Sequence, residues 1–180
     1  MRLIETLTIG LNRFNSLSSG DAEAELLKCC GARNWARRIA AQRPFANTDE
    51  LLDKAASIWW SLDPANWLEA FRSHPKIGEK KAAQPTSAEA RTWSEQEQSG
   101  TRNAAPETIE ALSIGNRDYE QKFGYIFIVC ATGKSSEEML TRLSERLGND
   151  PERELRIAAE EQSRITQLRL KKLIDSFGHE

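Results

Sequence analysis

The last part of the chain carries the feature that most constrains the fold, an apolar stripe with helical spacing. Between Leu155 and Leu173, apolar side chains recur every three or four positions, which places them on one face of a single helix. We expect this helix to cover residues 151–176, with Asn149 and Glu152 forming a capping box at its start. Such a long amphipathic helix must bury its stripe against other elements, so the rest of the chain decides the fold class.

Helical spacing recurs through the rest of the chain, interrupted by short turns and by an exposed, charged loop expected at residues 78–85. Only residues 125–130 resemble a strand, and since one strand has nothing to pair with, we expect a buried extended segment or a helix start there. The sequence therefore predicts an all-α bundle of about seven to nine helices, forming a single domain over residues 1–180. The expected helix starts are Asp21, Asn34, Thr48, Asp63 with Pro64, Thr86 with Glu89, Pro106, and Ser135 with Glu138.

The charge distribution excludes several classes of function. The 25 Lys and Arg residues are balanced by 27 Asp and Glu residues, and the two signs are interleaved along the chain. Nucleic-acid-binding proteins and membrane-surface helices usually carry a basic stripe or block, so we expect neither kind of partner. No apolar run is long enough to span a bilayer, and the N-terminal residues lack the apolar core of a signal peptide.

The cysteines indicate a reducing compartment, and we expect the protein in the cytoplasm. Cys29, Cys30 and Cys130 are odd in number and have no metal-ligand spacing, so we expect buried free thiols rather than disulfides or a zinc site. A redox-active pair at Cys29 and Cys30 is the alternative. The chain also has no dinucleotide-binding or pyridoxal-type signature, so we expect neither a metal nor a bound cofactor.

Residues 133–135 look like the end of a phosphate-binding loop, but Ile128 stands where that motif requires a glycine. A helix cap at Ser135 explains these residues better.

His74 is the main candidate for acid–base chemistry, because the only other histidine, His179, lies near the C-terminal end. We expect His74 at a surface turn, where the ring of Pro75 restricts the backbone. Functional residues often occupy such turns. A lone histidine can also be structural or simply exposed, and the pattern alone leaves these interpretations open.

Glu97 falls on the same helix face as Trp93, so we expect its carboxylate to be partly buried. Ser94 and Gln98 bring further polar side chains close to it. The alternative interpretation is a structural ion pair.

Arg169 and Gln162 occupy core-facing positions in the stripe of the last helix. A buried guanidinium needs an anion, which is either a protein carboxylate such as Glu97 or a ligand.

Four segments of this sequence resemble the decarboxylases of urate breakdown that act on 2-oxo-4-hydroxy-4-carboxy-5-ureidoimidazoline (OHCU). The resemblance covers residues 11–173, with the segments in the same order and at compatible spacing. It implies an all-helical, cofactor-independent enzyme of purine catabolism, commonly a homodimer, that converts this small ureide to (S)-allantoin. The four segments are residues 71–78 (FRSHPKIG), 94–100 (SEQEQSG), 116–135 and 161–170.

The resemblance also implies roles for individual residues. Arg164 is a less favoured match to the family's late arginine than Arg169, and Glu95 lacks the serine spacing that Glu97 has. The implied catalytic residues are His74 and Glu97, and the implied substrate-binding residues are Pro75, Ser94, Gln98, Gly124, Tyr125, Ile126, Phe127 and Arg169.

Two other functions remain open. A hydrolase or isomerase acting on a related ureide would use the same residues without releasing CO₂. A helical adaptor module would need neither His74 nor Glu97 and would expose a large apolar patch. Inward-facing charges at Glu97 and Arg169 disfavour the adaptor, since buried charge stabilises a fold poorly.

Overall fold

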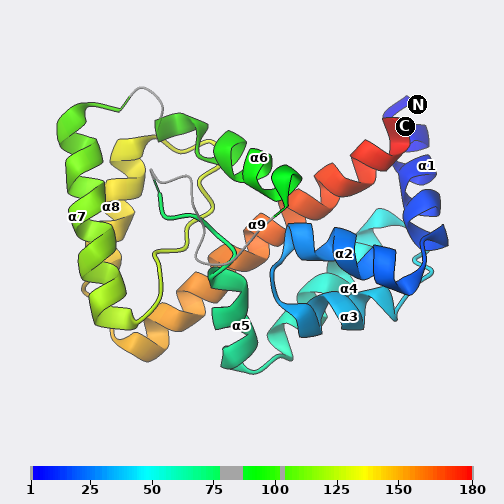
Figure 1. The fold of residues 1–180 in the computed structure, drawn as a ribbon, viewed down its shortest axis with the longest axis horizontal. Helices are drawn as coiled ribbons and strands as arrows, with labels where there is room; N and C mark the ends of the chain where they lie inside the picture. Colours follow the sequence, from blue (N-terminus) through cyan, green and yellow to red (C-terminus); the bar gives the residue numbers. More distant parts are fainter. Residues whose placement is uncertain (1, 78–86, 102–103, 180) are drawn as a thin grey trace. The chain divides into compact units, whose positions relative to one another are not determined.

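The computed structural model describes residues 2–77, 87–101 and 104–179. These residues form nine α-helices and one short 3₁₀ helix, with no strand among them, which confirms the predicted all-α class (Figure 1). The loop predicted at residues 78–85 lies outside the described residues. None of the described helices is both long enough and apolar enough to cross a membrane. The helices are α1 (Arg2–Ser16), α2 (Ser19–Cys29), α3 (Arg33–Ala40), α4 (Thr48–Trp60), α5 (Pro64–Phe71), α6 (Ala88–Glu97), η1 (Ser99–Thr101), α7 (Pro106–Phe123), α8 (Ser136–Arg146) and α9 (Pro151–His179).

The contacts divide the chain into two compact units. The first unit comprises Met1–Trp67 and Ser163–Glu180, and the second comprises Leu68–Gln162. Helix α9 therefore begins in the second unit and ends in the first.

The first unit contains α1 to α4 and the C-terminal part of α9. Helix α3 packs against both α2 and α4 (Figure 1). Arg43 satisfies backbone carbonyls that the end of α1 leaves without helical partners, donating to Phe14 O at 3.0 Å and to Leu17 O at 2.7 Å. The fully buried side chains of Phe14, Leu26 and Trp35 form part of the core of this unit.

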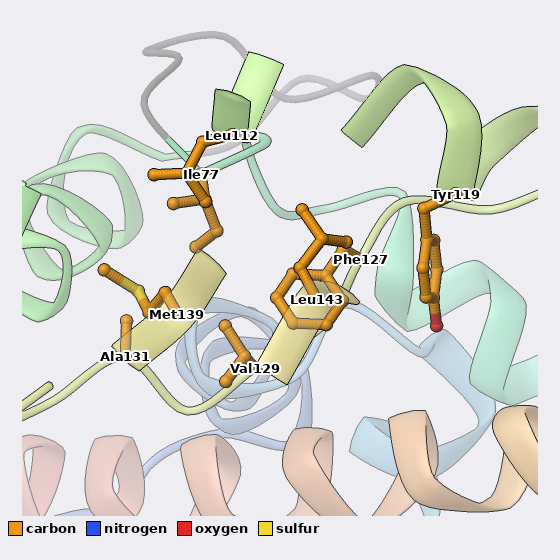
Figure 2. Packing of buried hydrophobic residues seen from close by; sticks show 8 residues of the cluster. All are labelled: Ile77, Leu112, Tyr119, Phe127, Val129, Ala131, Met139 and Leu143. Carbon is orange, nitrogen blue, oxygen red and sulfur yellow. The ribbon is translucent and has the colours of Figure 1, made fainter. Parts of the chain in front are cut away.

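The second unit is built around α7 and α8, which pack against each other and against residues 125–131. We call residues 125–131 the extended segment, because they are neither helical nor paired in a sheet. Its alternate residues Phe127, Val129 and Ala131 lie in one apolar cluster, as expected for a chain whose side chains alternate between two faces (Figure 2). The other members of this cluster are Ile77, Leu112, Tyr119, Met139 and Leu143. The prediction of a buried extended segment is therefore confirmed.

Three of the predicted helix caps are wrong by one residue, while the capping box of Ser135 and Glu138 is confirmed. At the start of α4, Asn47 and Thr48 are both able to cap, and the cap falls to Asn47 because Thr48 is already helical. Asn47 has φ −155° and ψ 170°, and its side chain accepts a hydrogen bond from the Glu50 N–H. The observed caps are Asn47 for α4, Ser87 for α6 and Asp150 for α9, where Thr48, Thr86 with Glu89, and Asn149 with Glu152 were predicted.

Candidate active site

The extended segment has no partner strand, so its buried backbone groups need other hydrogen-bond partners. Charged side chains supply them. Arg146 Nη1 donates to Ile128 O at 2.7 Å, and Lys134 Nζ donates to Cys130 O at 2.5 Å. Glu161 Oε2 accepts a hydrogen bond of 2.7 Å from the Cys130 N–H. Three charged side chains thus hold this stretch of backbone in its extended conformation.

His74 follows directly after α5, in a turn closed by a 3.2 Å hydrogen bond from the His74 N–H to Phe71 O. Only 7% of His74 is exposed, so the prediction of a surface turn is wrong. The segment after the turn is attached to α7. Asn116 Nδ2 donates to Ile77 O at 3.2 Å, and Lys76 forms a 2.7 Å salt bridge with Glu120.

The C-terminal turn of α6 carries the second group of predicted site residues. Glu97 is 9% exposed and Ser94 is buried, whereas Glu95 and Gln96 are exposed. The predicted inward face of this helix is therefore confirmed, and Gln98, at its C-cap, is half-buried. The Ser94 hydroxyl donates to Ala90 O at 3.0 Å and so has an acceptor within its own helix.

Helix α6 is held in place through the 3₁₀ turn that follows it. Ser136 Oγ, at the start of α8, donates to Gly100 O at 3.1 Å. A Cβ atom at Gly100 would lie 2.1 Å from Lys134 O, so only glycine permits this close approach of the two backbones. The motif residues 94–100 are thus fixed against the start of α8.

Gly124 begins the next group of predicted site residues by ending α7 with a left-handed backbone, φ +78°. Its N–H donates to Glu120 O at 2.8 Å. The chain then enters the extended segment with Tyr125 half-buried and with Ile126 and Phe127 buried. Glycine at this position lets the helix stop abruptly and the backbone become extended within one residue.

The His74 turn lies near the start of the extended segment, and the turn after α6 lies against Lys134, just beyond the end of that segment. At its start, the rings of Phe71 and Tyr125 are 5.4 Å apart, which places the end of α5 beside Tyr125. Near its end, burial raises the pKa of the Cys130 thiol; Lys134 lowers it, and the Glu161 and Glu97 carboxylates raise it. The second unit thus gathers the His74 turn, α6 and the extended segment.

A buried network of charges that the sequence analysis did not identify supports this arrangement. Arg146 Nε and Nη2 bond to Glu154 Oε1 at 2.7 Å and 2.6 Å, and the Tyr119 hydroxyl donates to the same oxygen. Asn149 Nδ2 donates to the other Glu154 oxygen at 2.7 Å. Helical spacing could have identified two of these residues. Arg146 is three residues after Leu143 in α8, and Glu154 is four before Ala158 in α9.

Arg169 belongs to the first unit, and its core-facing position is confirmed. It is 2% exposed, and its Nη1 donates to Lys28 O at 3.3 Å, near the C-terminus of α2. Burial raises the pKa of the neighbouring Cys29 thiol, and the Arg169 charge opposes that shift. Gln162, the other polar residue predicted in the stripe, is fully buried.

The cysteines and the loop at residues 133–135 agree with their sequence interpretation. All three cysteines are buried and free. Ser135 caps α8 and Lys134 binds the extended segment, so these two residues have structural roles. Within the described residues, no group of three or more His, Cys, Asp and Glu side chains is arranged to hold a metal ion.

His74 and Glu97 are buried beside a fixed segment of backbone in an all-helical chain, an arrangement that favours a helical enzyme over an adaptor. Comparison with known families specifies which enzyme class. Residues 15–171 match the family model described as OHCU decarboxylase. The chain therefore belongs to the OHCU decarboxylase family, as the motif resemblance predicted.

Individual relatives agree with this assignment. The chain is 37% identical over 152 residues to the uric acid degradation bifunctional protein TTL of Arabidopsis thaliana, covering 84% of this chain and 47% of that protein. It thus spans about half the length of the Arabidopsis protein. It is 35% identical over 140 residues to the 2-oxo-4-hydroxy-4-carboxy-5-ureidoimidazoline decarboxylase of Amia calva, covering 77% of this chain and 79% of that one.

Two solved structures share the fold. A crystal structure of OHCU decarboxylase in the presence of (S)-allantoin has 36% sequence identity and a TM-score of 0.73, covering 84% of this chain and 97% of that chain. An (S)-allantoin synthase structure has a TM-score of 0.66, covering 91% of this chain and 53% of that one. At 16% identity, this second likeness concerns the fold alone.

Proposed function

We propose that this chain decarboxylates OHCU to (S)-allantoin during urate breakdown, without a bound cofactor. The observation that carries the proposal is membership of the OHCU decarboxylase family over residues 15–171. The burial of His74 and Glu97 supports it, because acid–base groups shielded from bulk water interact more strongly with a substrate.

The substrate supplies its own electron sink. The carbon that bears the carboxylate and the hydroxyl adjoins a ring C=N bond. When the bond to the carboxylate breaks and CO₂ leaves, the electron pair moves toward that C=N bond and its nitrogen takes up a proton. Proton transfer to the former imine carbon then gives (S)-allantoin, as the hydroxyl-bearing carbon becomes a carbonyl.

The protein residues hold the substrate and move protons. His74 hydrogen-bonds the substrate hydroxyl or carboxylate and acts as the acid–base group. Glu97 hydrogen-bonds a ring or ureido N–H, so that one face of the substrate is presented for protonation. Arg169 binds the anionic substrate. The remaining binding groups are Pro75, Ser94, Gln98, Gly124, Tyr125, Ile126 and Phe127.

Assembly and location complete the proposal. We propose a homodimer, as the resemblance to the family implies, and we propose the cytoplasm as its location. Buried free cysteines are compatible with a reducing compartment.

The direct test uses freshly generated urate-oxidation intermediate. CO₂ release and the optical activity of the product are followed with and without the protein, because the uncatalysed reaction supplies the background. We expect faster CO₂ release and (S)-allantoin in excess, and His74→Asn should remove most of this acceleration, about 10²–10⁴-fold. Product formation without CO₂ would instead identify a hydrolase or isomerase, and a folded His74→Asn variant with full turnover would remove His74 from the mechanism.

A further inference from the structure

The backbone N–H and the backbone carbonyl of Cys130 are each bound by a charged side chain, and the two side chains have opposite charge. Its N–H donates to Glu161 Oε2 at 2.7 Å, and its carbonyl accepts from Lys134 Nζ at 2.5 Å. Lys134 lies four residues further along the chain, in the loop that directly follows the extended segment. Glu161 comes from α9, 31 residues away, and therefore ties the extended segment to a different element.

Glu161 is a strong constraint on this backbone. It is 5% exposed, so its hydrogen bond to the Cys130 N–H is shielded from water. An ionised carboxylate accepts a shorter and stronger hydrogen bond than a neutral group does. Without this acceptor, a buried N–H would have to find another partner, which requires the extended segment to shift.

The backbone that Glu161 holds is also linked to the proposed site, because Lys134 donates to Cys130 O and the Lys134 carbonyl closely approaches Gly100, just after α6. Burial raises the pKa of the Cys130 thiol and Lys134 lowers it. The carboxylates of Glu161 and Glu97 also raise this pKa. Two carboxylates from different helices thus act on one residue of the extended segment. A shift of that segment would alter both the backbone from Gly124 to Phe127 and the surroundings of Glu97.

We propose that Glu161 is a positioning residue, which fixes the extended segment so that substrate meets this backbone and Glu97 in one geometry. The inference rests on the proposed function. Glu161 acts through the segment and does not touch the substrate. Its role is to keep the extended segment at the right distance from the substrate, since a misplacement of about 1 Å in an active site can lower turnover about 10²-fold.

The test compares three substitutions at Glu161 with a control one residue away. Glu161→Ala removes the acceptor, and Glu161→Asp draws it back by one methylene. Glu161→Gln keeps an oxygen at the same reach. Glu160 is exposed on the same helix, so Glu160→Gln is the matched control. For each variant we would measure kcat and KM for OHCU, the melting temperature, and hydrogen exchange at the Cys130 amide.

We expect Glu161→Ala and Glu161→Asp to lower kcat/KM about tenfold or more, with faster exchange at Cys130. Glu161→Gln should keep much of the wild-type kcat/KM and much of the slow exchange at Cys130. Glu160→Gln should match the wild type in both measurements. Activity retained by Glu161→Gln would not be expected if Glu161 contributed only its negative charge to the stability of the fold.

The proposal is overturned if Glu161→Ala or Glu161→Asp, once folded, keeps the wild-type kcat/KM, whatever its melting temperature. It is also overturned if Glu161→Gln is as impaired as Glu161→Asp, because the backbone acceptor would then not be what matters. Should Glu161→Ala fail to fold, the Asp and Gln variants decide. An inactive wild type contradicts the proposed function itself, while exchange at Cys130 still reports whether Glu161 holds the segment.

Discussion

The side-chain amide of Asn116 donates a hydrogen bond of 3.2 Å to the backbone oxygen of Ile77, and so attaches α7 to the chain just after His74 and Pro75. Asn116 is 5% exposed, so this bond lies out of reach of bulk water. The neighbouring salt bridge of Lys76 with Glu120 is more exposed and contributes less to stability. Asn116 is therefore a buried polar attachment between the proposed catalytic turn and α7.

Replacing Asn116 should consequently affect stability and turnover together. Asn116→Ala leaves the Ile77 oxygen without this donor, and we expect the free energy of unfolding to fall by about 1–3 kcal/mol. Because Ile77 is close to His74 in the chain, kcat should fall as well. Denaturant unfolding and steady-state kinetics measure the two effects. Ser113→Ala, on the exposed side of α7, is the control. An unchanged kcat in the folded variant would limit Asn116 to a structural role.

Glu97 and Glu95 form a natural pair for testing the second catalytic assignment. They lie on the same helix, but Glu97 is buried and Glu95 is exposed. Glu97→Gln removes the charge that strengthens a hydrogen bond to a substrate N–H, so we expect kcat/KM to fall about tenfold or more. The product should also be less enriched in the (S) form, whereas Glu95→Gln should behave as the wild type. Polarimetry with kinetics would contradict the assignment if the two variants were indistinguishable.

The inward faces of the helices could be predicted from the sequence, because burial follows the spacing of apolar residues. That spacing correctly placed Glu97 and Arg169 inside. Helix starts were less predictable, because residues such as Asn47 and Thr48 are both good caps and the tertiary structure decides which one has extended backbone.

The partners of the extended segment could not be predicted in the same way. Its hydrogen bonds come from Lys134, Arg146 and Glu161, which lie at different distances along the chain and have no common spacing. The burial of His74 was missed for a similar reason, since it depends on tertiary contacts. A local pattern contains no information about contacts of this kind.

The three cysteines should react slowly with alkylating reagents in the native protein. They are buried, and burial raises the pKa of both Cys29 and Cys130. A raised pKa means that less of the reactive thiolate is present at a given pH, so labelling should become appreciable only above the usual pH for a thiol. Iodoacetamide labelling followed by mass spectrometry measures this. In strong denaturant all of them should react quickly, and rapid labelling of a native cysteine would contradict the prediction.

Measurements of stability and of substrate binding distinguish two roles for Arg169, substrate binding and a structural ion pair. The side chain is 2% exposed, and its Nη1 donates a hydrogen bond to Lys28 O. If the guanidinium binds substrate, Arg169→Lys keeps the charge but loses the planar pair of donors, so KM should rise while the fold persists. Arg169→Met should raise KM further with only a modest loss of stability, because removing an arginine that awaits an anionic substrate leaves no protein carboxylate buried and uncompensated.

A purely structural Arg169 predicts the opposite pattern. A permanent pairing with a protein carboxylate would make Arg169→Met lose about 3–5 kcal/mol, because the partner acid would be left buried and uncompensated. Arg164 is exposed on the same helix and is the less favoured family match, so Arg164→Met is the control. Melting temperature and KM are measured on the same preparations. A steep fall in the melting temperature of Arg169→Met with an unchanged KM would remove Arg169 from the substrate site, and a raised KM for Arg164→Met alone would move the assignment to Arg164.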